Sequence, residues 1–155
     1  MRQSSVDGRQ STAKAIVLAG LTVGALDTLL AMGLYRVSPF VTYQSIAGGF
    51  YGRSTYQHGW TTAALGWFLH FLIATTAAAV YVVASRIWPV LVRHAVACGM
   101  AYGVVVYAFM NHVVIPMSAI AHRPKPLWEL MGGLIGHIFL VGLPIGLIAR
   151  RYSRV

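Results

Sequence analysis

Residues 60–85, WTTAALGWFLHFLIATTAAAVYVVAS, hold no Lys, Arg, Asp or Glu over 26 positions. A helix rises 1.5 Å per residue, so about 20 apolar residues cross the roughly 30 Å of hydrocarbon in a bilayer. Three further apolar runs lie at about residues 15–35, 92–115 and 127–148. The sequence therefore predicts an all-α fold, a bundle of four transmembrane helices that forms one domain over residues 14–151.

The composition agrees with a membrane protein. Of 155 residues 57% are hydrophobic and 10% are charged, and the mean hydropathy is +0.67. A soluble domain carries about 25% charged residues, so an ordinary soluble enzyme and a disordered chain are excluded. The single cysteine, Cys98, excludes a disulfide scaffold. The net charge of +9 lies in the gaps between apolar runs, so we expect lipid head groups and no nucleic acid as its partner.

The distribution of basic residues predicts the orientation. Four spans put both termini on one side of the membrane, and that side carries eight Lys and Arg residues against four on the other. The richer side is normally cytoplasmic, so we expect cytoplasmic termini, with residues 1–13 as a flexible tail. The eight are Arg2, Arg9, Lys14, Arg86, Arg93, Arg150, Arg151 and Arg154, and the four are Arg36, Arg53, Arg123 and Lys125.

The gap at 37–59 is longer than a simple loop. Phe40, Tyr43, Ala47 and Phe50 recur in it at helical spacing. This pattern predicts a short helix at about 40–51, either along the outer interface or re-entrant between the helices. The connection at 86–93 is short and predicts that the second and third spans form an antiparallel hairpin.

Pairs of glycine four residues apart indicate the faces that pack against other helices. They are Gly20 with Gly24, Gly99 with Gly103, and Gly132 with Gly136.

Each predicted span contains one ionisable residue near the same depth: Asp27, His70, His112 and His137. All four lie about 10–15 Å from the outer interface at the helical rise. A charge at the bilayer centre costs about 2.5–3.5 kcal/mol on insertion scales, so these side chains are expected to face the bundle interior. They are our candidate polar site.

Several chemistries fit this set. His70, His112 and His137 are suitable ligands for a metal ion, and two facing imidazoles can hold haem. A layer of His and Asp can also carry protons, or it can simply fix helix register through hydrogen bonds. Candidate entrance residues nearer the outer surface are Gln44, Arg53 and Glu129.

Four segments resemble a group of short, four-span bacterial inner-membrane proteins of unassigned function, and the resemblance covers most of residues 14–150. The segments are QSIAGG at 44–49, LGWFLH at 65–70, NHVVIPMS at 111–118 and GHIFLVGLPIG at 136–146.

Residues 105–140, with ELMGGLIGH at 129–137, also resemble the YagU-like inner-membrane proteins, a group associated with survival in acid. These resemblances imply a bacterial inner-membrane location and a role in envelope stress. They supply no catalytic residues.

The sequence thus favours a multi-pass inner-membrane protein whose polar site opens toward the outer face and handles protons or small solutes. Two alternatives remain: a metal- or haem-binding membrane protein that could be a redox enzyme, and an accessory subunit of a larger membrane complex. Either a homo-oligomer or such a complex is compatible with the glycine-rich faces.

Overall fold

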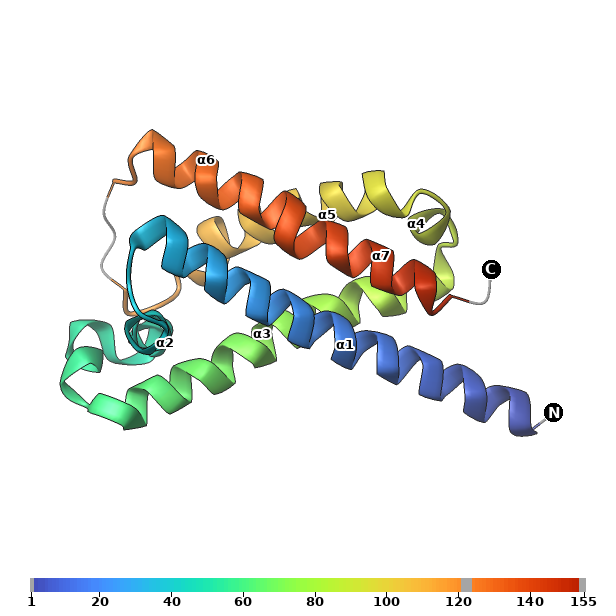
Figure 1. The fold of residues 1–155 in the computed structure, drawn as a ribbon, viewed down its shortest axis with the longest axis horizontal. Coiled ribbons are helices and arrows are strands. Elements are labelled where there is room, and N and C mark those ends of the chain that lie inside the picture. Colours follow the sequence, from blue (N-terminus) through green and yellow to red (C-terminus); the bar gives the residue numbers. More distant parts are fainter. Residues whose placement is uncertain (1, 121–123, 154–155) are drawn as a thin grey trace.

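The computed structural model describes residues 2–120 and 124–153, and every regular element in this part of the chain is helical (Figure 1). A π-helical turn, η2, ends the third span, another, η3, interrupts the fourth, and a 3₁₀ helix, η1, follows α2. The elements are α1 (Arg2–Tyr35), α2 (Pro39–Tyr51), η1 (Gly52–Gln57), α3 (Gly59–Ile87), α4 (Val90–Arg93), α5 (Ala95–Phe109), η2 (Met110–Val114), α6 (Leu127–Gly136), η3 (His137–Gly142) and α7 (Leu143–Arg151).

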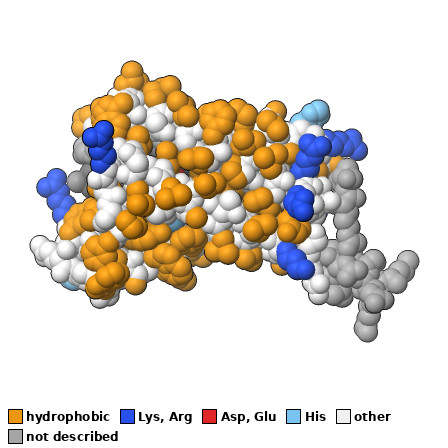
Figure 2. All heavy atoms as spheres, in the orientation of Figure 1, with side chains coloured by type: hydrophobic (Ala, Val, Ile, Leu, Met, Phe, Trp, Pro, Cys, Tyr) orange, Lys and Arg blue, Asp and Glu red, His pale blue; other side chains and the backbone are white. Residues whose placement is uncertain are grey.

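Four helical stretches are long and apolar enough to cross a membrane, which confirms the predicted architecture. They are Gln10–Tyr35, Gly59–Ile87, Ala95–Val114 and Leu127–Arg151. Figure 2 shows hydrophobic side chains over the middle of the molecule and Lys and Arg gathered at its two ends. Both ends of the described chain lie at the same end of the bundle (Figure 1), as an even number of spans requires.

The helices pack as two close pairs, α1 with α3 and α5 with the α7–η3 segment. Glycines on both sides bring α5 and α7 together. A Cβ atom added at Gly99 would lie 2.8 Å from the carbonyl oxygen of Gly142, and one added at Gly146 would lie 3.0 Å from the Cα of Gly99. The predicted role of the glycine pairs in helix packing is therefore confirmed at this interface.

The second and third spans run antiparallel on either side of the short connection (Figure 1), but each packs mainly on another helix. The main partners of α3 are α1 and α2, whereas α5 packs on α7 and η3. Tyrosine side chains bridge the wider gap between α3 and α5: the Tyr102 hydroxyl donates to the Ala77 carbonyl at 2.8 Å, and its ring lies 5.0 Å from that of Tyr81. A short connection fixes direction along the chain, but glycine complementarity decides which helix is the neighbour.

The amino-terminal segment is helical from its first described residue. Helix α1 begins at Arg2, so residues 2–13 continue the first span as helix, and residue 1 lies outside the described residues. The flexibility of this segment stays a prediction. Adding residues to an existing helix is far easier than starting one. At Ser11 the helix contacts the carboxyl end of the bundle, where the Ser11 hydroxyl donates to the Tyr152 carbonyl at 2.9 Å.

The predicted short helix between the first two spans is confirmed as α2. Ser38 caps it by accepting from the Val41 amide at 3.3 Å, and Pro39 occupies the first turn, where a missing amide hydrogen costs nothing. Figure 1 shows α2 nearly end-on, across the long axis of the bundle. Gly66 of α3 admits this crossing, because a Cβ there would collide with the Tyr43 carbonyl oxygen.

Candidate functional site

His70 lies where α1, α2 and α3 meet. Its Nε2 atom is 2.8 Å from the Gly24 carbonyl oxygen of α1 and 3.2 Å from the Thr28 hydroxyl. The Tyr43 hydroxyl of α2 is 3.2 Å from the same Thr28 oxygen. Thr28 is buried, while His70 and Tyr43 are half-buried. We call Thr28, Tyr43 and His70 the junction site.

The hydrogen bonds of the junction site fix the proton positions. A carbonyl oxygen only accepts, so His70 Nε2 carries a hydrogen and donates it to Gly24. Thr28 also donates to the Gly24 carbonyl, at 2.8 Å, so its oxygen accepts from Tyr43. In the neutral ring Nδ1 then holds a lone pair, and it has no hydrogen-bond partner among the described residues. This nitrogen is the free basic atom of the site.

The other two intramembrane histidines bind their own helices. His112 Nδ1 and His137 Nδ1 each lie 2.9 Å from the carbonyl oxygen four residues earlier, at Ala108 and Gly133 respectively. His137 is half-buried, and its ring meets that of Tyr107 edge-on at 5.3 Å. His112 is exposed. The span that holds it is the least covered, with 11% of its window buried against 28–33% in the others.

Both of these histidines lie in π-helical turns, His112 in η2 and His137 in η3. Single π turns inside α-helices occur frequently at functional sites. Apolar periodicity carries no signal for such a turn, so sequence reasoning missed both.

The structure does not gather the predicted polar set into one centre. His112 faces away from the bundle, whereas the sequence analysis placed all four side chains inside it. Asp27 is half-buried and makes no hydrogen bond or ion pair with a described residue. Among the described residues no three His, Cys, Asp or Glu side chains lie close enough to hold a metal ion. Within the described residues His70 is thus joined to the Thr28 hydroxyl and not to the other two intramembrane histidines.

Two of the candidate entrance residues have different surroundings. Gln44 is 3% exposed, and its Nε2 donates to the Gly59 carbonyl at 3.1 Å. The Gln44 carbonyl accepts from the Thr55 hydroxyl at 2.7 Å. Gln44 therefore ties α2 to η1 and to the start of α3. Arg53 is exposed at the surface of η1.

Glu129, the third candidate entrance residue, is only 4% exposed despite its place in the first turn of α6. The Tyr35 hydroxyl, at the end of α1, donates to its Oε1 atom at 3.0 Å. Lys125, which precedes α6, donates to Asn111 Oδ1 at 2.6 Å. This region is a buried polar contact between α1 and α6 and is separate from the junction site.

Sequence reasoning found His70 but missed Thr28, which bonds to it, and Tyr43, which bonds to Thr28. Thr28 follows Gly24 by four residues, which is the spacing of a side-chain bond to a helical carbonyl, yet threonine is common in helices and gave no specific signal. Tyr43 was assigned to the apolar side of α2. Only the crossing of α2 over α3 at Gly66 brings its hydroxyl to Thr28.

Together the fold and the site define a class, the α-helical multi-pass membrane protein with polar groups inside its spans. No known family model matches the chain, no curated protein matches it in sequence and no solved structure matches it. The resemblance to YagU-like proteins and to the short four-span group therefore stays an expectation.

Proposed function

We propose that this protein handles protons at an intramembrane site centred on His70, in the outer half of the bilayer. The observation that carries the proposal is the connected set of Tyr43, Thr28 and His70, drawn from three helices and ending in a free imidazole nitrogen. Hydroxyl and imidazole groups in contact can pass a proton from one to the next. A polar chain inside a membrane span is by default a functional hypothesis.

Asp27 supports the same proposal. It directly precedes Thr28 in α1 and carries no partner among the described residues. An ionisable side chain inside a membrane span is costly to bury and commonly marks a proton or ion pathway. Asp27 therefore supplies a second proton-binding group on the same turn of α1. A small polar solute with a donor for His70 Nδ1 is the other cargo that this chemistry fits.

The proposed orientation places α2 at the outer face. The end of the bundle that carries the described termini would then be cytoplasmic, in a bacterial inner membrane, as the eight-to-four split of basic residues favours. The junction site would be reached from the outer side, past Tyr43. An envelope-stress role follows only from the resemblance and belongs to the same proposal.

Proton flux into vesicles tests the function. The purified protein is reconstituted in liposomes that enclose a pH-sensitive dye, and an imposed pH difference is followed with time. We expect wild-type protein to raise the rate above that of empty liposomes, and His70→Ala to return it to the empty level. Thr28→Val and Tyr43→Phe, which remove one hydroxyl each, should lower the rate by about a hundredfold, the low end of the usual contribution of a positioned proton-transfer group.

His112→Ala is the matched control. It removes the same kind of side chain from a membrane span, but His112 bonds only to its own helix. We expect its flux to equal that of the wild type. Equal loss in His112→Ala and His70→Ala, or wild-type flux no greater than that of empty liposomes, would refute proton handling at the junction site.

A further inference from the structure

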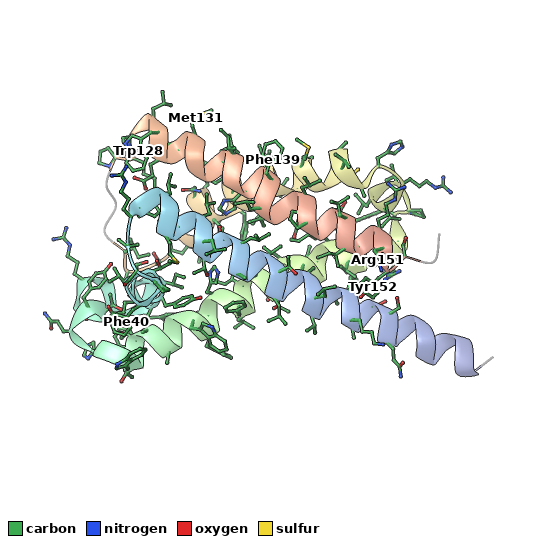
Figure 3. The ribbon with its side chains drawn as sticks, viewed as in Figure 1. Phe40, Trp128, Met131, Phe139, Arg151 and Tyr152 are labelled. Atoms are coloured by element: carbon green, nitrogen blue, oxygen red, sulfur yellow. The ribbon has the colours of Figure 1, made fainter. Side chains whose placement is uncertain are left out.

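An open cavity of about 310 Å³ lies at the end of the bundle opposite α2, between α4 and the carboxyl end of α7. Val92 and Arg93 line it from α4, and Arg150 and Ser153 line it from α7 and the residues that follow. Figure 3 labels Arg151 and Tyr152 at this end of α7. Two guanidinium groups from separate segments thus border one cavity that lies away from the junction site.

The fold of the described residues does not use either guanidinium group. Arg93 and Arg150 are exposed, and neither has a hydrogen bond or ion pair with a described residue. All three acidic residues, Asp7, Asp27 and Glu129, lie outside the segments that line the cavity. Two guanidinium groups without a partner among the described residues therefore face a cavity that no described acidic side chain lines.

Two of the carbonyl groups at the end of α7 already accept hydrogen bonds from the protein. The Arg150 carbonyl accepts from the Ser153 amide at 3.1 Å and from the Ser153 hydroxyl at 2.7 Å. The Tyr152 carbonyl accepts from Arg86 at 3.1 Å and from Ser11 at 2.9 Å. Arg86 is thereby occupied as a brace, while Arg93 and Arg150 remain available.

We infer that this cavity binds the phosphate of an anionic phospholipid head group. Guanidinium groups match phosphate oxygens in a planar, two-point geometry. The cavity also lies at the level of the head groups, because Trp88, which is 59% exposed between α3 and α4, marks the interfacial zone. Basic pockets between transmembrane helices are a known way of binding anionic head groups. We call the cavity with Arg93 and Arg150 the phosphate pocket.

The test measures lipid binding by native mass spectrometry. Delipidated protein in detergent is titrated with phosphatidylglycerol or phosphatidylcholine, and the bound fraction is recorded. We expect phosphatidylglycerol to bind preferentially. Arg93→Gln and Arg150→Gln should each weaken its binding by about tenfold, the expected effect of losing one charge-assisted contact. Arg150→Lys, which keeps the charge but loses the planar fork, should weaken it less.

Arg151→Gln is the matched control. Arg151 lies exposed in the same last turn of α7, so its replacement removes the same charge, but it does not line the phosphate pocket. We expect at most a twofold change or so in that variant, since an isolated surface charge contributes little. An equal loss in Arg151→Gln and Arg150→Gln, or no preference for phosphatidylglycerol, would overturn the pocket.

Inorganic phosphate identifies the source of the anion. In a competition with phosphatidylglycerol we expect it to displace the lipid only weakly, because it lacks the acyl chains that anchor a lipid beside α4. If phosphate alone displaced the lipid at equal concentration, the proposal of a lipid ligand would be refuted and the pocket would be assigned to a soluble anion. Unfolding temperatures measured without phosphatidylglycerol check that each variant is folded.

Discussion

The single hydroxyl group of Thr28 connects α1, α2 and α3. It donates within its own helix to Gly24 and touches side chains of α2 and α3. Without these hydrogen bonds, each of the groups would leave an unpaired polar atom in a low-dielectric interior, which costs free energy. Thr28 therefore serves the stability of the three-helix junction as well as the proposed proton path.

Thr28→Val should lower the free energy of unfolding by about 0.6–2 kcal/mol, the range for interhelical hydrogen bonds in membranes. Thr76→Val is its control, because the exposed Thr76 hydroxyl bonds only to the Leu72 carbonyl of its own helix. Denaturant-induced unfolding in mixed micelles measures both. A loss in Thr76→Val as large as that in Thr28→Val would show that the contacts across helices contribute nothing.

The hydrogen bond from Tyr35 to the buried Glu129 should also stabilise the fold. Removing the Tyr35 hydroxyl takes a donor from a carboxyl group that is 4% exposed, so Tyr35→Phe should lower the free energy of unfolding by about 1–3 kcal/mol. Tyr56→Phe is the matched change on an exposed ring of η1 and should stay within about 0.5 kcal/mol of the wild type. Similar values for the two variants would mean that the Tyr35–Glu129 bond does not stabilise the fold.

At the scale of elements, the α5–α7 interface depends on the absence of side chains. The positions that a Cβ of Gly142 would need are taken by backbone atoms of Gly99 and Gly103. Backbone atoms cannot move aside as a flexible side chain can. A methyl group added at this closely packed interface therefore cannot be accommodated without a cost in free energy.

Gly142→Ala should therefore force α7 away from α5 and lower the free energy of unfolding by about 1–3 kcal/mol, the usual cost of overpacking. Gly33→Ala in α1 has no atom within 4 Å of the new methyl and should raise the free energy of unfolding by up to about 1 kcal/mol through helix propensity. Both are measured by the same unfolding assay. Equal stability of the two variants would contradict the close approach of α5 and α7.

At the scale of the whole molecule, the described ends lie at one end of the bundle and η1 lies at the other (Figure 1). Cysteine labelling tests the proposed orientation in a Cys98→Ala background. Ser5→Cys should react with a membrane-impermeant maleimide only after the cells are opened, and Gln57→Cys, at an exposed position of η1, should react in intact cells. Labelling of position 5 from outside would reverse the orientation, and labelling of both positions from one side would contradict the four-span fold.

The sequence by itself determined the spans and the short helix α2. An uninterrupted apolar run of this length forms a helix in lipid, because its backbone N–H and C=O groups must be hydrogen-bonded within the segment. Its glycine pairs also indicated the packing faces. The apolar run could not show that the helix continues back to Arg2, since a polar segment joined to a helix is free to extend it.

The tertiary structure alone decided the partners. Away from the short connection, a helix packs against the neighbour whose small residues match its own. This match places α5 on α7, and His112 is left exposed. Depth along a helix can be counted from sequence, but rotation about its axis depends on the neighbour it packs against. For that reason Asp27, His70, His112 and His137 could be assigned to one layer, while the hydrogen bonds that join His70 to Thr28 and Thr28 to Tyr43 depend on how α1, α2 and α3 pack together.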